Sequence, residues 1–245
     1  MISVIMLSYN NVRFLMESIQ SVLNQTYTDW ELVISDDGST DGSWEIAQAM
    51  EKKHKKIKAF QTSERLGIPK NRKFAFEKTK GEFFCHLDGD DALFPYTLST
   101  LIDNIKNFDM VFSDMVWIDE NGKNIQYYQN ESVEIKDLGY RHITLFRKSV
   151  YDKLQGYNDQ LKHYCEDGDL FMQFAEKKNY KLVPQVLYKF RQHGNNTSRL
   201  KKDCRTCLDK SHCNYIKIWA KENDWDVDQW KWQKSENYVP VIGVQ

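Results

Sequence analysis

The sequence predicts an α/β protein in which helices flank a mostly parallel sheet. Three apolar stretches near the N-terminus each run directly into a polar cluster: Val4–Leu7 into Ser8–Asn10, Leu32–Ile34 into Ser35–Ser39, and Phe83–Cys85 into His86–Asp91. Short apolar runs are typical of strands buried on both faces, and segments with helical spacing separate these three, so parallel pairing is expected. Because parallel strands bind ligands at their carboxyl ends, the clusters are expected to meet at one edge of the sheet, around a charged ligand and a metal ion.

Helices are expected between these strands. Apolar residues recur at helical spacing up to Leu23, after two candidate capping residues, Asn10 and Asn11. A second amphipathic helix follows the polar residues 41–43 and extends to Met50.

The next segments continue the alternation of strands and helices. A third strand is expected over residues 57–60, and a third helix over about 71–80, after the Gly67-Ile68-Pro69 segment. Pro95 opens a fourth helix that runs to Ile105, since proline suits the first turn of a helix.

From Asp109 onward the pattern is less regular. The expected elements are strands over 110–112 and 116–118, a hairpin strand over 125–127 after an Asn121-Gly122 turn, a helix over 167–175, a strand over 181–190 and a helical tail from about residue 200. The sequence contains no internal repeat and no low-complexity linker.

Composition limits the possible functions. The chain has 245 residues, of which 41% are hydrophobic and 28% charged, as in an ordinary globular protein with one α/β domain and an extension. Its 34 basic and 35 acidic residues give a formal net charge of -1. This balance provides no electrostatic footprint for nucleic acid, so nucleic acid is not expected as a partner.

Other features indicate the compartment. Met1 begins almost directly in a strand, so no signal peptide is expected, and no apolar run is long enough to span a bilayer. The odd, scattered set of cysteines fits a reducing compartment better than a disulfide framework; it comprises Cys85, Cys165, Cys204, Cys207 and Cys213. We expect a cytoplasmic protein.

The acidic cluster Asp88-Gly89-Asp90-Asp91 is the main chemical clue. Carboxylates separated by one small residue at a strand end can hold a divalent cation, while the glycine allows a ligand to approach the backbone. The alternative to metal binding is that these are solvated acidic residues of a loop. Upstream, Asp36 and Asp37 supply carboxylates that could accept hydrogen bonds from a base or ribose, and Tyr9 offers a stacking face.

Ordered motifs extend over roughly the first two hundred residues. They are Val4–Asn10, Ser21–Tyr27, Val33–Gly42, Gly81-Glu82 leading into Leu87–Asp91, Glu166-Asp167 and Arg191–Asn195. Together they resemble the family 2 inverting glycosyltransferases of the GT-A fold. The resemblance implies a Rossmann-like sheet with a small acceptor-side subregion. It suggests a nucleotide-sugar-binding region at 1–108, an acceptor-binding and catalytic region of the same domain at 109–198 and a helical C-terminal extension at 199–245.

The resemblance also implies how the nucleotide is held. Tyr9 would stack on the nucleobase, usually uracil, and Asp37 would accept the ring N–H. Ser8 and Asn10 would shape this pocket, and Asp88, followed by Gly89, would face the ribose. A core aromatic is the alternative for Tyr9.

The same resemblance assigns the diphosphate and the metal. Asp90 would bind Mn²⁺ or Mg²⁺ through the donor diphosphate, His193 would complete the metal shell, and Asp91 would support these ligands or cap a helix. Arg72 and Arg191 would lie near the diphosphate. Two alternatives stay open: a structural hydrogen bond for the histidine, and a solvated surface position for a basic residue.

The implied reaction is a single displacement with inversion. Asp167 takes the position of the general base, and Glu166 would orient its loop or cap the following helix. An acceptor hydroxyl would attack the anomeric carbon while the nucleoside diphosphate leaves, so one base and one group holding the leaving group suffice. The expected donor is a UDP-sugar, and the expected acceptor is a glycan or a lipid-linked saccharide of the cell surface.

Single features of the sequence argue against the rival functions. A nucleotidyltransferase or a dinucleotide oxidoreductase should show a glycine-rich loop after its first strand, but no glycine precedes Gly38. A processive synthase is disfavoured because the sequence lacks membrane helices and a Gln-x-x-Arg-Trp segment. A catalytically silent sugar-nucleotide-binding module is the main alternative, although Asp90 and Asp167 are both present.

The tail has two features with alternative interpretations. Cys204, Cys207, His212 and Cys213 have zinc-ligand spacing, but helical packing is favoured. Tryptophans between Trp219 and Trp232 could dock on the inner face of a membrane, yet interleaved aspartates would be repelled by anionic lipid. Packing against the catalytic domain or against a second subunit is therefore favoured.

Overall fold

The computed structural model describes residues 1–128, 142–159, 161, 166–194 and 196. The predicted C-terminal extension, with its cysteine cluster and its tryptophans, lies outside these residues. In the described part, nine strands form one sheet: β1 (Ile2–Ser8), β2 (Trp30–Asp36), β3 (Ile57–Gln61), β4 (Phe83–Asp88), β5 (Ala92–Leu93), β6 (Met110–Ile118), β7 (Asn124–Tyr128), β8 (Thr144–Arg147) and β9 (Tyr180–Arg191). Their order is β3-β2-β1-β4-β8-β6-β9-β5, and β7 pairs with β6.

The first half of the sheet is parallel, as predicted. β1 pairs with β2 and β4, and β2 pairs with β3, all in parallel. Successive side chains of β1 point to opposite faces of the sheet, and each face is covered by a hydrophobic cluster. Met6 lies in one cluster and Ile5 in the other, and both side chains are fully buried. A strand covered on both faces must be apolar at successive positions, and this explains the continuous apolar run in the sequence.

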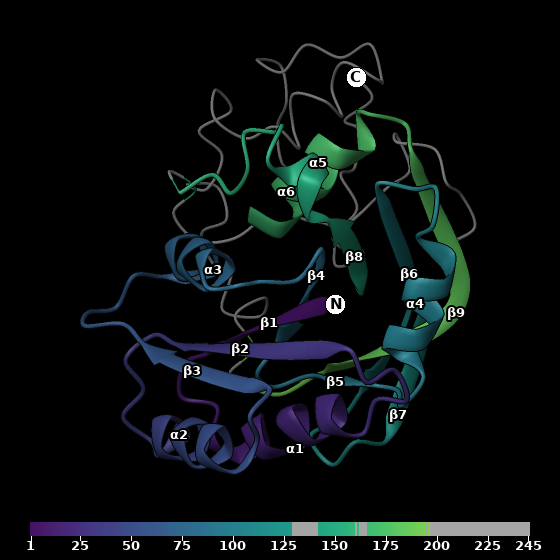
Figure 1. The fold of residues 1–245 in the computed structure, drawn as a ribbon. Helices are drawn as coiled ribbons and strands as arrows, with labels where there is room; N and C mark the ends of the chain where they lie inside the picture. Colours follow the sequence, from purple (N-terminus) through teal and green to yellow (C-terminus); the bar gives the residue numbers. More distant parts are fainter. Residues whose placement is uncertain (129–141, 160, 162–165, 195, 197–245) are drawn as a thin grey trace, which may run out of the picture.

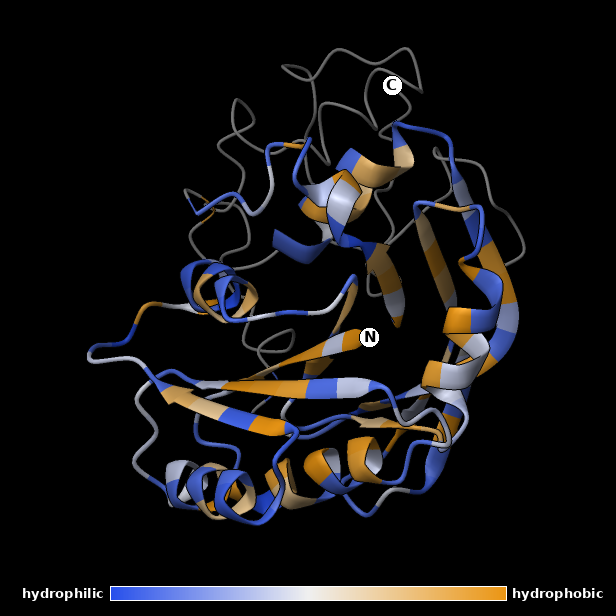
Figure 2. Cartoon of the chain, viewed as in Figure 1, coloured by the Kyte–Doolittle hydropathy of each residue, from blue (hydrophilic) through white to orange (hydrophobic). Residues whose placement is uncertain are grey.

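Helices cover both faces of this half (Figure 1). The helices of the described residues are α1 (Val12–Leu23), α2 (Ser43–Lys53), α3 (Ile68–Glu77), α4 (Thr97–Asn104), α5 (Lys148–Tyr151) and α6 (Glu166–Ala175), of which α4 packs against β6 and β9 and α5 against β8. α1 and α2 lie on one face, and α3 and α6 lie on the other. In Figure 2 the strand β1 is mostly orange, whereas α2 and α3 mix blue and orange residues, as amphipathic helices do. The apolar side of each helix therefore closes a core against the sheet.

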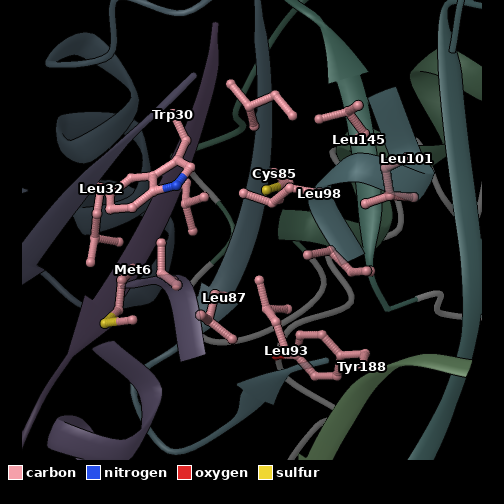
Figure 3. Close-up of a cluster of buried hydrophobic side chains, with 14 of the residues drawn as sticks. Met6, Trp30, Leu32, Cys85, Leu87, Leu93, Leu98, Leu101, Leu145 and Tyr188 are labelled. Atoms are coloured by element: carbon pink, nitrogen blue, oxygen red, sulfur yellow. The ribbon is translucent and has the colours of Figure 1, made fainter. Parts of the chain in front are cut away.

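The larger core joins distant parts of the sequence (Figure 3). Met6, Leu32 and Cys85 from the parallel strands meet Leu98 and Leu101 of α4 there. Burial raises the pKa of the Cys85 thiol to about 12. This cysteine is therefore a small apolar core residue rather than a nucleophile.

The second half of the sheet is mixed. β8 lies between β4 and β6 and is antiparallel to both, while β6 is parallel to β9. The predicted hairpin is present: β6 and β7 pair in antiparallel fashion, and Gly122 in their turn has a φ of +83°. Residues 110–112 and 116–118 belong to one continuous strand, and the short strand β5 was not predicted.

The starts of α3 and α4 and the capping of α1 differ from the predictions; α4 begins at Thr97 rather than at Pro95. α3 begins at Ile68, before the expected residue 71, because Pro69 fits the first turn, where its missing N–H costs nothing. Asn11 does precede α1, but its Oδ1 accepts the backbone N–H of Tyr9 at 3.1 Å. The Val12 N–H at the start of α1 is instead bound by Asp41 Oδ2 at 2.9 Å, from the neighbouring loop.

Leu101→Ala tests whether α4 is held by its apolar side. Leu101 is fully buried in the larger core, so its truncation should leave a cavity and lower the free energy of unfolding by about 2–5 kcal/mol in denaturant titration. Asp103→Ala removes an exposed side chain from the same helix and should change stability by less than about 0.5 kcal/mol. Equal losses from both variants would show that α4 is not anchored by this core.

Candidate active site

The three polar clusters of the sequence meet at adjacent strand ends, as predicted. In the parallel register Ser8 lies opposite Asp36, and Leu7 lies opposite Asp88. The carboxyl ends of β1, β2 and β4 therefore form one continuous edge. Such an edge is where parallel α/β sheets bind ligands.

The loops after β1 and β2 are joined to each other. Asn10 adopts a φ of +54°, a left-handed conformation that asparagine tolerates better than most residues. Its backbone N–H donates to Ser39 Oγ at 2.9 Å, and its Oδ1 accepts the Thr40 N–H at 2.9 Å. Asn10 thus fixes one loop against the other.

Asp36 and Asp37 both hold protein loops. Asp36 is fully buried and accepts hydrogen bonds from the backbone N–H and the hydroxyl of Ser39, at 2.8 and 2.5 Å. Asp37 accepts the N–H groups of Leu66 and Gly67 at 2.8 and 2.9 Å, and the Thr62 hydroxyl at 3.1 Å. A carboxylate has about four acceptor positions, so Asp37 retains capacity for one further donor.

Two side chains near this edge have unusual surroundings. The Tyr9 ring is 39% exposed, and the guanidinium carbon of Arg65 lies 4.0 Å from its centroid. The tyrosine is therefore an exposed aromatic at the strand end rather than a core residue. Ser8 Oγ is buried and has no hydrogen-bond partner among the described residues. An unsatisfied buried hydroxyl costs about 1–3 kcal/mol, so this hydroxyl is available to a further hydrogen-bond partner.

Arg72 connects the nucleotide side of the edge to α6. Its side chain is only 3% exposed, with Nε 2.9 Å from Glu166 Oε1 and Nη2 3.3 Å from Asp88 Oδ1. The guanidinium thus lies between the carboxyl groups of Asp88 and Glu166. Burial, followed by the nearby Asp167 carboxylate, raises the pKa of Glu166 to about 8, against the opposing effect of Arg72.

Asp90 and His193 lie together although they are far apart in the sequence. His193 Nε2 is 2.9 Å from Asp90 Oδ2, and the imidazole packs on the Phe14 ring at a centroid distance of 4.8 Å. Within the described residues no three His, Cys, Asp or Glu side chains gather to hold a metal ion by themselves.

Asp91 supports this loop rather than capping a helix. It is 1% exposed and accepts the Tyr188 hydroxyl and the Arg191 backbone N–H, each at 2.7 Å. Burial, together with the charges of Asp90 and Asp88, raises the pKa of Asp91 well above its usual range.

Arg191 is buried behind the same loop. Its Nε donates to the Asp90 carbonyl oxygen at 2.8 Å, and its Nη2 lies 2.7 Å from Glu17 Oε2. Its Nη1 donates to the carbonyl oxygens of Asp119 and Glu120, both at 3.3 Å. The expected phosphate-binding group is therefore used within the protein, where it fastens the Asp90 loop.

Asp167 lies in the first turn of α6. It is half-buried, and its Oδ1 accepts the Gly168 N–H at 2.7 Å. The first turn also contains Glu166 and Asp169, and the helix dipole favours negative charge at this end. Because Glu166 binds Arg72, the helix that carries Asp167 is fixed relative to Asp88.

Sequence reasoning missed four residues around this centre. His86 Nε2 is 2.5 Å from the Tyr157 hydroxyl, and His142 stacks on Tyr188 with centroids 4.6 Å apart. Burial lowers the pKa of both histidines, and the Arg72 charge adds to this effect for His86. His86 begins the polar cluster that follows Phe83–Cys85, and this was a signal for one of them; the other three gave none.

The fold and the acidic strand-end site define a nucleotide-sugar glycosyltransferase of the GT-A fold. Residues 3–178 match the family model Glycosyl transferase family 2, and the chain belongs to this family, as its motifs predicted. It is 33% identical over 205 residues to EpsE of Bacillus subtilis (strain 168), which bears a glycosyltransferase name; the match covers 78% of this chain and 73% of that protein.

Other relatives and structures agree. Chondroitin synthase of Escherichia coli is 27% identical over 212 residues, a match that covers 83% of this chain but 30% of that protein. S. aureus TarS in complex with UDP-GlcNAc superposes with a TM-score of 0.69 at 20% identity, over 90% of this chain and 70% of that one. GalNAc-T7 with UDP, GalNAc and Mn²⁺ superposes with a TM-score of 0.68 at 15% identity. This match covers 91% of this chain and 49% of that one. These likenesses confirm the fold.

Gly89→Ala tests the packing of the acidic loop. A β-carbon at Gly89 would lie 2.8 Å from the Leu7 carbonyl oxygen and 3.0 Å from Asn11 Nδ2, so the loop would have to move away from β1. We expect a loss of about 1–3 kcal/mol in unfolding free energy and weaker UDP binding by calorimetry. Gly194→Ala is the control, because nothing lies within 4 Å of its added carbon. Unchanged stability and UDP binding in Gly89→Ala would contradict the tight contact.

The raised pKa of Glu166 predicts a pH-dependent stability. Between the ordinary value of 4.5 and about 8, the folded protein holds a proton that the unfolded chain has lost. The free energy of unfolding should therefore fall as pH rises through this window and level off above it. Glu166→Gln cannot ionise and should flatten the slope measured by denaturant titration from pH 5 to 9, whereas the exposed Glu45→Gln should not. An unchanged slope in Glu166→Gln would assign the pH dependence to another group.

Proposed function

We propose that this glycosyltransferase moves one sugar from a UDP-sugar to a hydroxyl of a glycan or a lipid-linked saccharide, with inversion at the anomeric carbon. The observation that carries the proposal is the alignment of Ser8, Asp36 and Asp88 at neighbouring strand ends, with Arg72 linking Asp88 to the helix of Asp167. Neighbours of the same fold are described in complex with UDP and UDP-GlcNAc.

The base would bind between Tyr9 and Asp37. An exposed ring at the strand end offers a stacking face once the Arg65 guanidinium shifts, and the remaining acceptor position of Asp37 suits the ring N–H of uracil. The unpartnered hydroxyl of Ser8 would gain a hydrogen-bond partner from the nucleotide. Asn10 keeps the loop closed around this pocket, and Asp88 faces the ribose.

A divalent cation fits the donor set beside the diphosphate. Carboxylate oxygen suits Mn²⁺ and Mg²⁺, and Mg²⁺ is usually held by one or two carboxylates together with substrate phosphates. Asp90 and His193 would hold the ion, and the phosphates would supply further ligands, in keeping with the small number of protein ligands here. When bound, the cation stabilises the negative charge that develops on the leaving diphosphate.

Asp167 would act as the base. The acceptor hydroxyl forms a bond to the anomeric carbon as its proton passes to the Asp167 carboxylate, and the bond from that carbon to the diphosphate oxygen breaks. The Glu166–Arg72–Asp88 chain holds this carboxylate at a fixed distance from the donor. When the base, the acceptor hydroxyl and the donor are held in this geometry, part of the entropic barrier to the displacement is removed.

Residues 1–108 would bind the donor and residues 109–198 the acceptor, in the cytoplasm at the inner face of the membrane. The scattered cysteines support a reducing compartment. None of the described helices is long and apolar enough to cross a membrane.

Asp167→Asn separates the enzyme from a silent binding module. The amide keeps the shape but cannot accept a proton, so transfer should fall at least about 100-fold while UDP affinity stays nearly unchanged. The assays are UDP release from a panel of UDP-sugars, with saccharide acceptors, and calorimetry with UDP. The exposed Asp152→Asn serves as the control.

Two results would count against this assignment. Normal transfer by Asp167→Asn would move the base to Glu166 or Asp169, the other acids of that turn. If the unmutated protein binds UDP but releases none from any sugar nucleotide, it is a sugar-nucleotide-binding module and the proposed transfer is wrong.

A further inference from the structure

One side of α1 contacts the loop that carries Asp90. Phe14, Glu17 and Ser18 lie three and four residues apart, so they share one face of the helix. Ser18 Oγ donates to the Asp91 carbonyl oxygen at 2.5 Å, and the Phe14 ring lies against His193. The helix therefore contacts both the backbone next to Asp90 and the imidazole of His193.

The buried guanidinium of Arg191 poses an electrostatic problem at this place. It is 1% exposed and donates to the carbonyl of Asp90, so a fixed positive charge lies beside a loop that should receive a divalent cation. Like charges this close repel more strongly in a poorly solvated site than in water. Among the described residues, the Glu17 carboxylate is the one acidic side chain that forms an ion pair with this guanidinium.

We propose that Glu17 is a positioning residue for the divalent cation. Its carboxylate neutralises Arg191 and draws Nη2 toward α1, which keeps the guanidinium from binding the Asp90 carboxylate in the cation's place. The inference rests on the metal step of the proposed function. It extends that step to a helix residue that touches neither nucleotide nor metal.

Glu17 differs from an ordinary surface ion pair. Exposed pairs contribute little because water and salt screen both partners, and Glu17 itself is 54% exposed. Its partner, however, is buried, and removal of one partner leaves a buried charge uncompensated. The uncompensated charge of Arg191 would then act on the Asp90 loop, which is bonded to the same guanidinium.

The test compares Mn²⁺ binding and UDP binding in Glu17→Gln and the unmutated protein. With UDP present, the dissociation constant for Mn²⁺, measured by calorimetry, should rise about threefold to tenfold in Glu17→Gln. In excess chelator, UDP should bind as tightly as before or more tightly, because an uncompensated guanidinium favours an anion. Glu17→Asp should restore much of the Mn²⁺ affinity. The control is Glu51→Gln, which removes the Glu51–Lys58 pair at 3.8 Å between α2 and β3 and should change neither affinity.

Opposite effects on cation and anion distinguish positioning from mere support of the fold. Equal Mn²⁺ affinity in Glu17→Gln and the unmutated protein overturns the inference. So does a parallel loss of Mn²⁺ affinity, chelator-resistant UDP affinity and melting temperature, because that pattern belongs to a structural role. If the unmutated protein binds UDP but no Mn²⁺, the metal step of the proposed function is wrong and the inference falls with it, while the UDP site stands.

Discussion

The arrangement of the site depends on the contacts of the buried Arg72 guanidinium. It is buried between Asp88 at the end of β4 and Glu166 at the start of α6, residues that belong to different halves of the fold. A buried guanidinium needs acceptors for its N–H groups, and Asp88 Oδ1 and Glu166 Oε1 supply them at 3.3 and 2.9 Å. The requirement fixes the distance between the strand edge and the helix. Rigid placement of this kind is what a displacement reaction demands from its protein.

Local patterns in the sequence predicted the first half of the fold. Strands buried on both faces produce apolar runs that are visible without any partner, so β1, β2 and β4 and the meeting of their polar ends were foreseen correctly. The family followed from the motifs along these same strands. The site residues Asp88, Asp90 and His193 were named from the same motifs, and their roles stay predictions.

The remainder depends on contacts between distant segments. Nothing in the sequence near Arg191 shows that its side chain is buried against α1, because burial there is created by Phe14, Glu17 and the hairpin turn. Tyr157 gave no signal for the same reason: its bond to His86 bridges 71 positions in the sequence. The chemical type of a side chain is given by the sequence, whereas its burial and its partners depend on the packing of distant segments.

The position of β8 has a consequence for synthesis of the chain. This strand fills the gap between β4 and β6, yet it is translated after both. While the chain emerges from the ribosome, one edge of β4 therefore has no hydrogen-bonded neighbour. An unpaired strand edge can pair wrongly with other chains. A protein cut short before Arg147 would keep this edge exposed permanently. We therefore expect shortened versions that end before β8 to aggregate, even when they contain every strand of the nucleotide side.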